Sequence, residues 1–421
     1  MRTLFKNIKS LVGAYDHPPE RLFGSEMKSF ACLDNAWLAV EEGVIVDFGS
    51  MNSFPGIADW GGLEIVDCDG RYVLPAWCDS HTHMVFAALR SDEFLSRIQG
   101  KTYQEIAEAG GGILNSALAL QSMSEDALFE DAMQRLQVAI GFGTGAIEIK
   151  SGYGLTQEAE LKMLRVIARI KASASIPVRS TFLACHAVPS GNWTSESWTR
   201  HMIEDVLPIV KDLNLADYVD AFCEEGYFDV GAVQSLILAA RKLELPAKIH
   251  VNQFTALSGV KMCVEAGAIS VDHLEELTNE DVEALRRSNE DSKKGTIACA
   301  LPGCSYFLGI PYTPVRQLMK ADVPIALASD FNPGSAPSSN MSRVVQLGIL
   351  KMKMLPLESI AAATINGAAA MGLSDRAGVI SRGRAANLLL TRPMEGLESI
   401  AYDFGEEPVE KVFIDGVEHR S

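Results

Sequence analysis

Two histidines that close an apolar segment are the first candidates for chemistry in this chain. His81 and His83 follow the mostly apolar run 72–78, which is typical of a β-strand. Alternate side chains of a strand point to one face, so the two imidazoles can reach a common point. Histidine is the commonest metal ligand, and such a pair suits a metal site. The pair alone is equally compatible with a merely polar strand end.

The elements that would position these histidines alternate along the middle of the chain. Apolar segments of strand length are separated by amphipathic stretches of helical length, which predicts βα units and a parallel sheet. Eight such units in about 300 residues match an α/β fold of the (β/α)8 TIM-like barrel type. A doubly wound sheet is the alternative, but no glycine-rich dinucleotide fingerprint follows a strand. The expected strands span residues 77–83, 146–150, 178–186, 218–224, 247–252, 269–273, 296–301 and 324–330.

Polar residues gather at the ends of these expected strands. Besides the first pair, His186, His250, His273 and Asp330 each lie at or near a strand end. In a barrel of this type the active site lies at the carboxyl ends of the strands. A lone histidine on an apolar strand is usually a packed core residue. Five histidines at four strand ends, together with an aspartate, favour a shared site instead.

Three imidazoles and one carboxylate of this group suit Zn²⁺ or iron. The set is His81, His83, His250 and Asp330. Water on such an ion is acidified toward neutral pH and becomes a nucleophile. Asp330 can accept the proton of that water, and His273 is a second candidate for the catalytic base. The alternative for His273 is a structural role, bonded to Asp272 or Glu275.

The motifs around these residues resemble the amidohydrolase superfamily, and within it the imidazolonepropionase family. The superfamily motifs are the segments 79–83, 248–250 and 328–330, and the more specific ones are 147–155, 185–189, 271–275 and 330–335. The resemblance extends over nearly the whole barrel. It implies a barrel over residues 71–374 and a small β-sandwich domain formed by residues 1–70 and 375–421. Short β-like pieces with turn signals at both ends of the chain fit that division.

The resemblance implies the hydrolysis of 4-imidazolone-5-propanoate to N-formimidoyl-L-glutamate in histidine degradation. It implies one Zn²⁺ or iron ion per chain, held by the four residues named above. Two-metal barrels of the superfamily commonly bridge their ions with a modified lysine on the fourth strand, and no lysine lies there. Lys150, at the end of the second strand, is interpreted as structural or substrate-facing. The implied substrate and product contacts are Arg90, Tyr153, His186, Asn332, Gly334 and Ser335.

Some of these roles have independent support, and one residue departs from the pattern. The planar fork of Arg90 suits a propanoate carboxylate, with a surface salt bridge as the alternative. Tyr153 lies between two glycines, which give its loop freedom to close on a ligand or simply to pack. Gln253 stands where some family members have Glu. A carboxamide does not titrate, so at this position we expect a hydrogen bond to the substrate ring rather than acid–base chemistry.

Bulk properties narrow the remaining choices. The chain has 421 residues, 48% of them hydrophobic, and a net charge of -17, which argues against nucleic acid or an anionic membrane as a partner. Eight cysteines without a CxxC pair, and no secretion signal, predict a cytoplasmic protein that acts on a small molecule. A homodimer is kept as a hypothesis. Another cyclic-amide hydrolase or deaminase of the superfamily, or a non-catalytic metal-binding protein, are the alternative functions.

Overall fold

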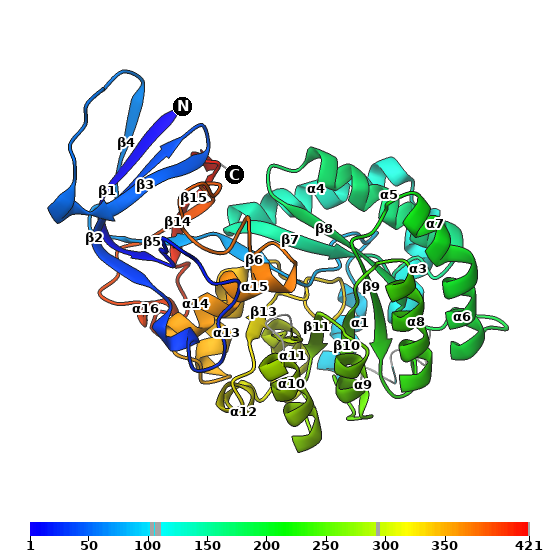
Figure 1. Ribbon diagram of the computed structural model, residues 1–421. Helices are drawn as coiled ribbons and strands as arrows, with labels where there is room; N and C mark the ends of the chain where they lie inside the picture. The colour runs from blue at the N-terminus through cyan, green and yellow to red at the C-terminus, as the bar shows by residue number, and fades with distance from the viewer. Residues whose placement is uncertain (102–104, 106–110, 292–294, 420–421) are drawn as a thin grey trace.

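The structure is a computed structural model that describes residues 1–101, 105, 111–291 and 295–419 (Figure 1). Two β-sheets organise these residues. One is a parallel barrel built from the middle of the chain, and the other joins strands from both ends of the chain. Among the described residues, no helix has both the length and the apolar character needed to cross a membrane.

The parallel sheet contains all eight expected barrel strands in chain order, which confirms the predicted fold class. The sheet closes between its first and last members. Thr82 pairs with Phe331, the His83 N–H donates to the Phe331 carbonyl (2.8 Å), and the Asp330 N–H donates to the His81 carbonyl (3.0 Å). The strands are β6 (Trp77–Asp79), β7 (Thr144–Lys150), β8 (Val178–Cys185), β9 (Tyr218–Cys223), β10 (Lys248–Val251), β11 (Ser270–His273), β12 (Ile297–Ala300) and β13 (Ile325–Leu327).

Helices connect successive barrel strands and cover the outside of the barrel (Figure 1). Their starts follow from local chemistry, because Ser124, Thr156 and Asp229 each accept a backbone N–H three residues ahead as helix N-caps. The helices are α1 (Ser91–Ile98), α3 (Ile113–Ser122), α4 (Glu125–Gly141), α5 (Gln157–Ser173), α6 (Ser195–His201), α7 (Leu207–Asp212), α8 (Val230–Lys242), α9 (Gly259–Glu265), α10 (Asn279–Asp291), α11 (Pro302–Leu308), α12 (Val315–Lys320), α13 (Met341–Leu350), α14 (Pro356–Ala363), α15 (Ile365–Ala370) and α16 (Ser399–Tyr402).

The second sheet forms a β-rich domain from the two ends of the chain. Its strands are β1 (Arg2–Val12), β2 (Cys32–Glu41), β3 (Val44–Ser50), β4 (Leu63–Asp67), β5 (Tyr72–Pro75), β14 (Leu388–Thr391), β15 (Val409–Ile414) and β16 (Val417–His419). The turn signals expected at both ends of the chain correspond to two hairpins, β2–β3 and β15–β16. Phe5 of β1 packs edge-on against Phe413 of β15 at 4.9 Å, although two strands separate them in the sheet, so the sheet curls around a core of its own. The residue limits of the two domains stay predictions.

Candidate metal centre and active site

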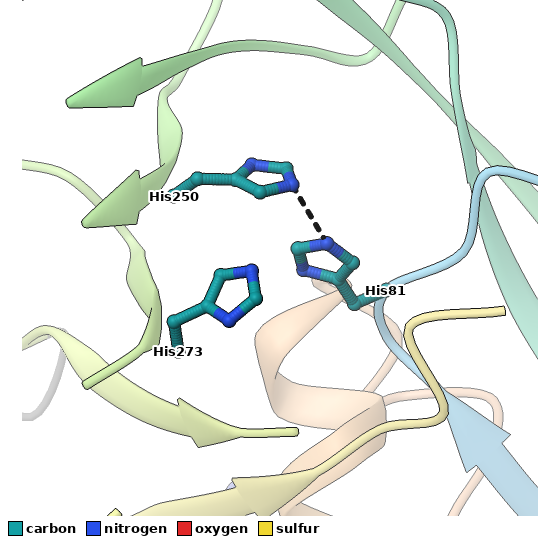
Figure 2. A group of neighbouring side chains, drawn as sticks. All are labelled: His81, His250 and His273. Atoms are coloured by element: carbon teal, nitrogen blue, oxygen red, sulfur yellow. Dashed lines mark hydrogen bonds between the residues drawn. The ribbon is translucent and has the colours of Figure 1, made fainter. Parts of the chain in front are cut away.

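Three imidazoles converge where the first and fifth barrel strands end. Nε2 of His250 lies 3.0 Å from Nε2 of His81 and 3.2 Å from Nε2 of His83. All three side chains are buried. Figure 2 shows the rings of His81 and His250 pointing toward one another, with His273 beside them. The prediction that these residues aim at one point therefore agrees with their placement, although His81 and His83 lie just beyond the last residue of β6.

Carboxylates behind two of the rings orient them. Nδ1 of His81 donates to Asp272 (2.6 Å), and Nδ1 of His250 lies 2.8 Å from Asp220. The ring proton of His81 is thus held at Nδ1, so its Nε2 atom presents a lone pair to Nε2 of His250. Burial, with neighbouring positive groups, lowers the pKa of His81 and His250 well below 6.5, so both rings are neutral near pH 7 and can act as metal ligands. A cation bound by both Nε2 atoms would account for their close approach.

Asp330 completes a four-membered set. Its Oδ1 atom lies 3.6 Å from Nε2 of His81 and 3.5 Å from Nε2 of His83. Four ligands at about 2.0–2.2 Å from a tetrahedral Zn²⁺ stand about 3.3–3.6 Å apart. The two distances to Asp330 match that edge length, and the two between imidazoles, 3.0 and 3.2 Å, are slightly shorter. Two overlapping groups have all their ligand atoms within 4.8 Å of one another, namely His81–His83–Asp330 and His81–His250–His273. Burial raises the pKa of Asp330 to about 6, against the opposing effect of His273. The residues present thus fit a metal ion.

His273 borders this set and has its own carboxylate. Its Nδ1 atom lies 3.4 Å from Glu275, which also accepts a hydrogen bond from Ser305 (3.0 Å). Burial alone would lower the pKa of His273, but Glu275, Asp330 and Asp272 together outweigh burial and raise that pKa above its ordinary value. Of the two partners considered for His273, Glu275 is the one present, whereas Asp272 binds His81. The ring still faces His250, at 5.4 Å between centroids.

Backbone strain marks the same strand ends. Asn252, His273 and Asp330 have φ values of 57°, 88° and 55°, in the left-handed region that non-glycine residues rarely adopt. Each such residue costs on the order of 1–3 kcal/mol and persists only where its surroundings fix it. The chain therefore accepts strain where it turns His273 and Asp330 toward the imidazoles.

The floor beneath the imidazoles is a cluster of charged side chains. It consists of Lys150, Glu148, Lys248, Asp220 and Asp272. Nζ of Lys150 lies 2.7 Å from Glu148, 2.9 Å from Asp220 and 3.8 Å from Asp272. Lys248 reaches the other oxygen of Glu148 at 3.1 Å. Burial would lower the pKa of Lys150, but Asp220, Glu148 and Asp272 outweigh it and raise that pKa. Lys150 therefore holds the carboxylates that orient His81 and His250, as its structural interpretation expects.

Arg90 lines the same cavity as His83 and His250, and it lies inside the protein rather than on its surface. It is 8% exposed, and its Nε atom is 3.6 Å from Glu93. Its backbone N–H donates to the Pro333 carbonyl (3.1 Å). A Cβ atom on Gly334 would lie 1.3 Å from Nη2 of Arg90, so only glycine lets the guanidinium occupy this place. The buried position of Arg90 does not fit the alternative role of a surface salt bridge.

Tyr153 and His186 form a second wall. Their rings are 5.2 Å apart, and each lies close to His83, at 5.7 Å and 5.3 Å respectively. Nδ1 of His186 donates to the Gly152 carbonyl (3.0 Å), and burial lowers the pKa of His186 to about 4. His186 is therefore neutral near pH 7, with Nε2 as a hydrogen-bond acceptor.

The loop after β13 is shaped by Asn332. Its side-chain oxygen accepts the backbone N–H groups of Gly334 (2.8 Å) and Ser335 (2.7 Å), and its amide donates to the Asp330 carbonyl (2.7 Å). Both the oxygen and the amide group of the Asn332 side chain are thus hydrogen-bonded within its own loop. Gln253, on the loop after β10, donates to Sγ of Cys304 (3.3 Å).

Comparisons with known proteins agree with this arrangement. The model of the Amidohydrolase family matches residues 72–418. The chain is 47% identical to an imidazolonepropionase of Christiangramia forsetii and 48% identical to one of Flavobacterium johnsoniae, in each case over 99% of both chains. The chain belongs to the imidazolonepropionases of the amidohydrolase family. The structure is also similar to an adenosine deaminase from Xanthomonas campestris with bound zinc (TM-score 0.66, 16% identity, 99% of this chain and 92% of that chain), which shows the shared fold.

One cavity brings together most of the candidate site residues that the sequence predicted. Its lining includes His83, Arg90, Tyr153, His186, His250, Gln253, His273, Asp330, Asn332 and Ser335. Of the remaining two, His81 lies beneath the lining, against His250, and Gly334 lies behind Arg90. Apolar side chains complete the wall, namely Ile113, Phe222, Phe254 and Leu308. The individual roles of these residues stay predictions.

Sequence reasoning missed two residues that support the site from behind, and it gave a third the wrong partner. Asp220, beside His250, and Cys304, which faces Gln253, were not singled out. Asp272 was considered only as a partner of His273, whereas it binds His81. The usable signal was an acidic residue inside an otherwise apolar strand, as at 220 and 272, because a buried carboxylate needs a charged partner. Nothing in the local sequence marks Cys304.

Proposed function

We propose that this protein hydrolyses 4-imidazolone-5-propanoate to N-formimidoyl-L-glutamate in the degradation of histidine. One water is consumed: the ring C–N bond at the carbonyl breaks, the carbonyl carbon gains the hydroxyl, and the nitrogen gains the proton. The observation that carries the proposal is the single cavity that joins the imidazole cluster to Arg90 and Tyr153, in a chain of the imidazolonepropionase family.

We propose one Zn²⁺ or iron ion per chain at His81, His83, His250 and Asp330. When bound, such an ion acidifies water and polarises a carbonyl group. The ligand spacing and the facing Nε2 atoms support this assignment, as does the zinc in the similar adenosine deaminase. His81 keeps its ring proton at Nδ1 through Asp272, which leaves Nε2 as the donor of the electron pair, and Asp220 lies 2.8 Å from Nδ1 of His250.

The opposite wall binds and orients the substrate. Arg90 pairs its guanidinium with the propanoate carboxylate, a charge-assisted contact that Gly334 makes room for. His186, neutral and with Nε2 as an acceptor, receives an N–H of the ring. Tyr153 closes on the ring from the side of His83. The loop of Asn332, Gly334 and Ser335 contacts the product side.

Proton transfer rests on His273, Asp330 or both. His273 is paired with Glu275, which favours the charged imidazolium after His273 takes a proton. Asp330 lies within 3.6 Å of two imidazoles and is buried. Gln253 neither takes nor gives a proton, so it serves as a hydrogen-bonding group toward the ring.

The test is an assay with purified, metal-loaded protein and 4-imidazolone-5-propanoate. Loss of the ultraviolet absorbance of the ring, with N-formimidoyl-L-glutamate as the product, is the expected result. Release of ammonia with an intact ring would point to deaminase chemistry instead. Bound metal without turnover of any cyclic amide would indicate a non-catalytic metal-binding protein.

A further inference from the structure

A buried carboxylate that takes no part in the proposed chemistry lies behind the loop of Tyr153. Glu160 belongs to α5 and is 1% exposed. One of its oxygens accepts the backbone N–H of Gly152 (2.9 Å), and the other accepts the N–H groups of Gly154 (2.6 Å) and Leu155 (3.1 Å). Three backbone N–H groups of one loop thus donate hydrogen bonds to a single carboxylate.

The loop needs such a partner because its own conformation is unfavourable. Gly152 has a φ of 104° and Leu155 a φ of 50°, both in the left-handed region. A Cβ atom on Gly154 would lie 2.4 Å from the backbone N of Glu160, so the loop rests directly on the start of α5. Buried N–H groups that lose their acceptor cost free energy, so the carboxylate and this loop conformation depend on each other.

The same loop carries two residues of the substrate wall. Tyr153 lies between the clamped N–H groups of Gly152 and Gly154, and its ring is 5.2 Å from His186. The Gly152 carbonyl accepts the Nδ1 proton of His186 (3.0 Å). A shift of this peptide would therefore move Tyr153 and also release the group that fixes the ring of His186.

We propose that Glu160 is a positioning residue of the substrate pocket, which sets Tyr153 and His186 by holding the N–H groups of residues 152, 154 and 155. This inference rests on the proposed function and assigns a source of its substrate affinity. It predicts that loss of the carboxylate weakens substrate binding and leaves the metal set intact, because the loop meets the proposed ligands through a ring contact, with Tyr153 5.7 Å from His83, while the three N–H groups of the loop are bound by Glu160.

The test compares Glu160→Gln with Glu158→Gln. Both residues lie on α5 and undergo the same chemical change, but Glu158 has an 80% exposed side chain bound only at the surface by Arg165. A carboxamide turns an NH₂ group toward one of the backbone donors. Displacement of the groups that position the substrate lowers catalytic efficiency by up to about 100-fold. We therefore expect Glu160→Gln to raise KM by about 10- to 100-fold, with a much smaller change in kcat.

Two further readouts separate positioning from general damage. Metal content by elemental analysis stays at the wild-type value, and the Kd of the unreactive analogue 3-(imidazol-4-yl)propanoate, measured by calorimetry, rises in parallel with KM. Glu158→Gln matches the wild type in all three. Unchanged KM and Kd in Glu160→Gln, or loss of metal in step with activity, overturns the inference.

Two further outcomes each require an additional experiment. If Glu160→Gln does not fold, Ser151→Ala decides, because the Ser151 side chain hydrogen-bonds Glu160 and accepts the Leu183 N–H (3.1 Å). Ser151→Ala should raise KM by a smaller factor than Glu160→Gln would. An unchanged KM in Ser151→Ala overturns the inference. If the wild type binds the analogue without opening the ring of imidazolone-propanoate, the proposed function fails, and the analogue Kd of Glu160→Gln still decides the role of Glu160.

Discussion

The floor and the wall of the cavity are held in different ways. Beneath the imidazoles, charged side chains hold one another: Lys150 binds Glu148, Asp220 and Asp272, and two of these carboxylates orient histidines. At the substrate wall, backbone atoms hold the side chains, as the Gly152 carbonyl holds His186. The metal side is thus specified by residue types at the ends of the barrel strands, and the substrate side by the conformation of loops. Changes to the floor should act on metal binding, and changes to the wall on KM.

The largest effect is expected at the metal set. His81→Ala or His250→Ala removes a proposed ligand whose Nε2 atom lies 3.0 Å from the Nε2 atom of the other. We expect metal content to fall from one ion per chain toward zero and turnover to be lost with it. Elemental analysis and the absorbance assay measure both. His201→Ala, on α6 and paired with Asp205, is the matched control. Two ions per chain, both needed for turnover, would contradict the single-metal assignment.

His273→Asn tests the group that borders the metal set. The four proposed ligands remain, so metal content should be unchanged. Loss of an acid–base group costs about 10²–10⁴-fold in rate. We expect kcat to fall within that range, because Gln253 has no proton to move. A variant with near-normal kcat would show that His273 and Glu275 are structural and would leave Asp330 as the base.

Lys150→Met tests the floor. It removes the ammonium that holds Asp220 and Asp272, and outer groups of this kind are worth about 10–100-fold in metal affinity. We expect a loss of that size in competition with a chelator, while KM of the reloaded protein changes little. Lys171→Met, which removes a surface ion pair with Asp217, is the control. Unchanged metal affinity would mean that the cluster serves stability alone.

Arg90→Ala tests the wall. It removes a charge-assisted contact worth about 1.5–3 kcal/mol, which corresponds to a rise in KM of about 10- to 100-fold. Metal content should not change. A ring substrate without the propanoate should be hydrolysed equally well by wild type and variant. If the variant keeps its affinity for imidazolone-propanoate, the buried Arg90 only supports the loop at Gly334.

The contrast between floor and wall also explains what the sequence could reveal. Histidines and an aspartate at the ends of apolar strands are chemically distinctive, and the parallel barrel brings all strand ends together, so His81, His250 and Asp330 were predictable. The choice between Asp272 and Glu275 as the partner of His273 was not. It depends on a tertiary contact, because Asp272 is bound by His81 from a distant segment, and on the path of the chain beyond the end of β11, where Glu275 lies. The clamp of Glu160 on residues 152–155 likewise depends on the path of a loop, which no periodicity records.

The smallest effect is expected at Gln253, where floor and wall meet. It lies three residues after His250, is 8% exposed and donates to Cys304. Gln253→Glu places a carboxylate close to Asp330 and His273, and a nearby negative charge raises the pKa of both. A base with a raised pKa loses its proton only at higher pH, so the acid limb of the pH–rate profile should move upward. Because His273 or Asp330 already moves the proton, kcat at the optimum should change by less than about tenfold. Gln317→Glu, an exposed site on α12, is the control. A rise in kcat well beyond tenfold would show that a carboxylate at position 253 is a better base than either, and that proton transfer limits the natural enzyme.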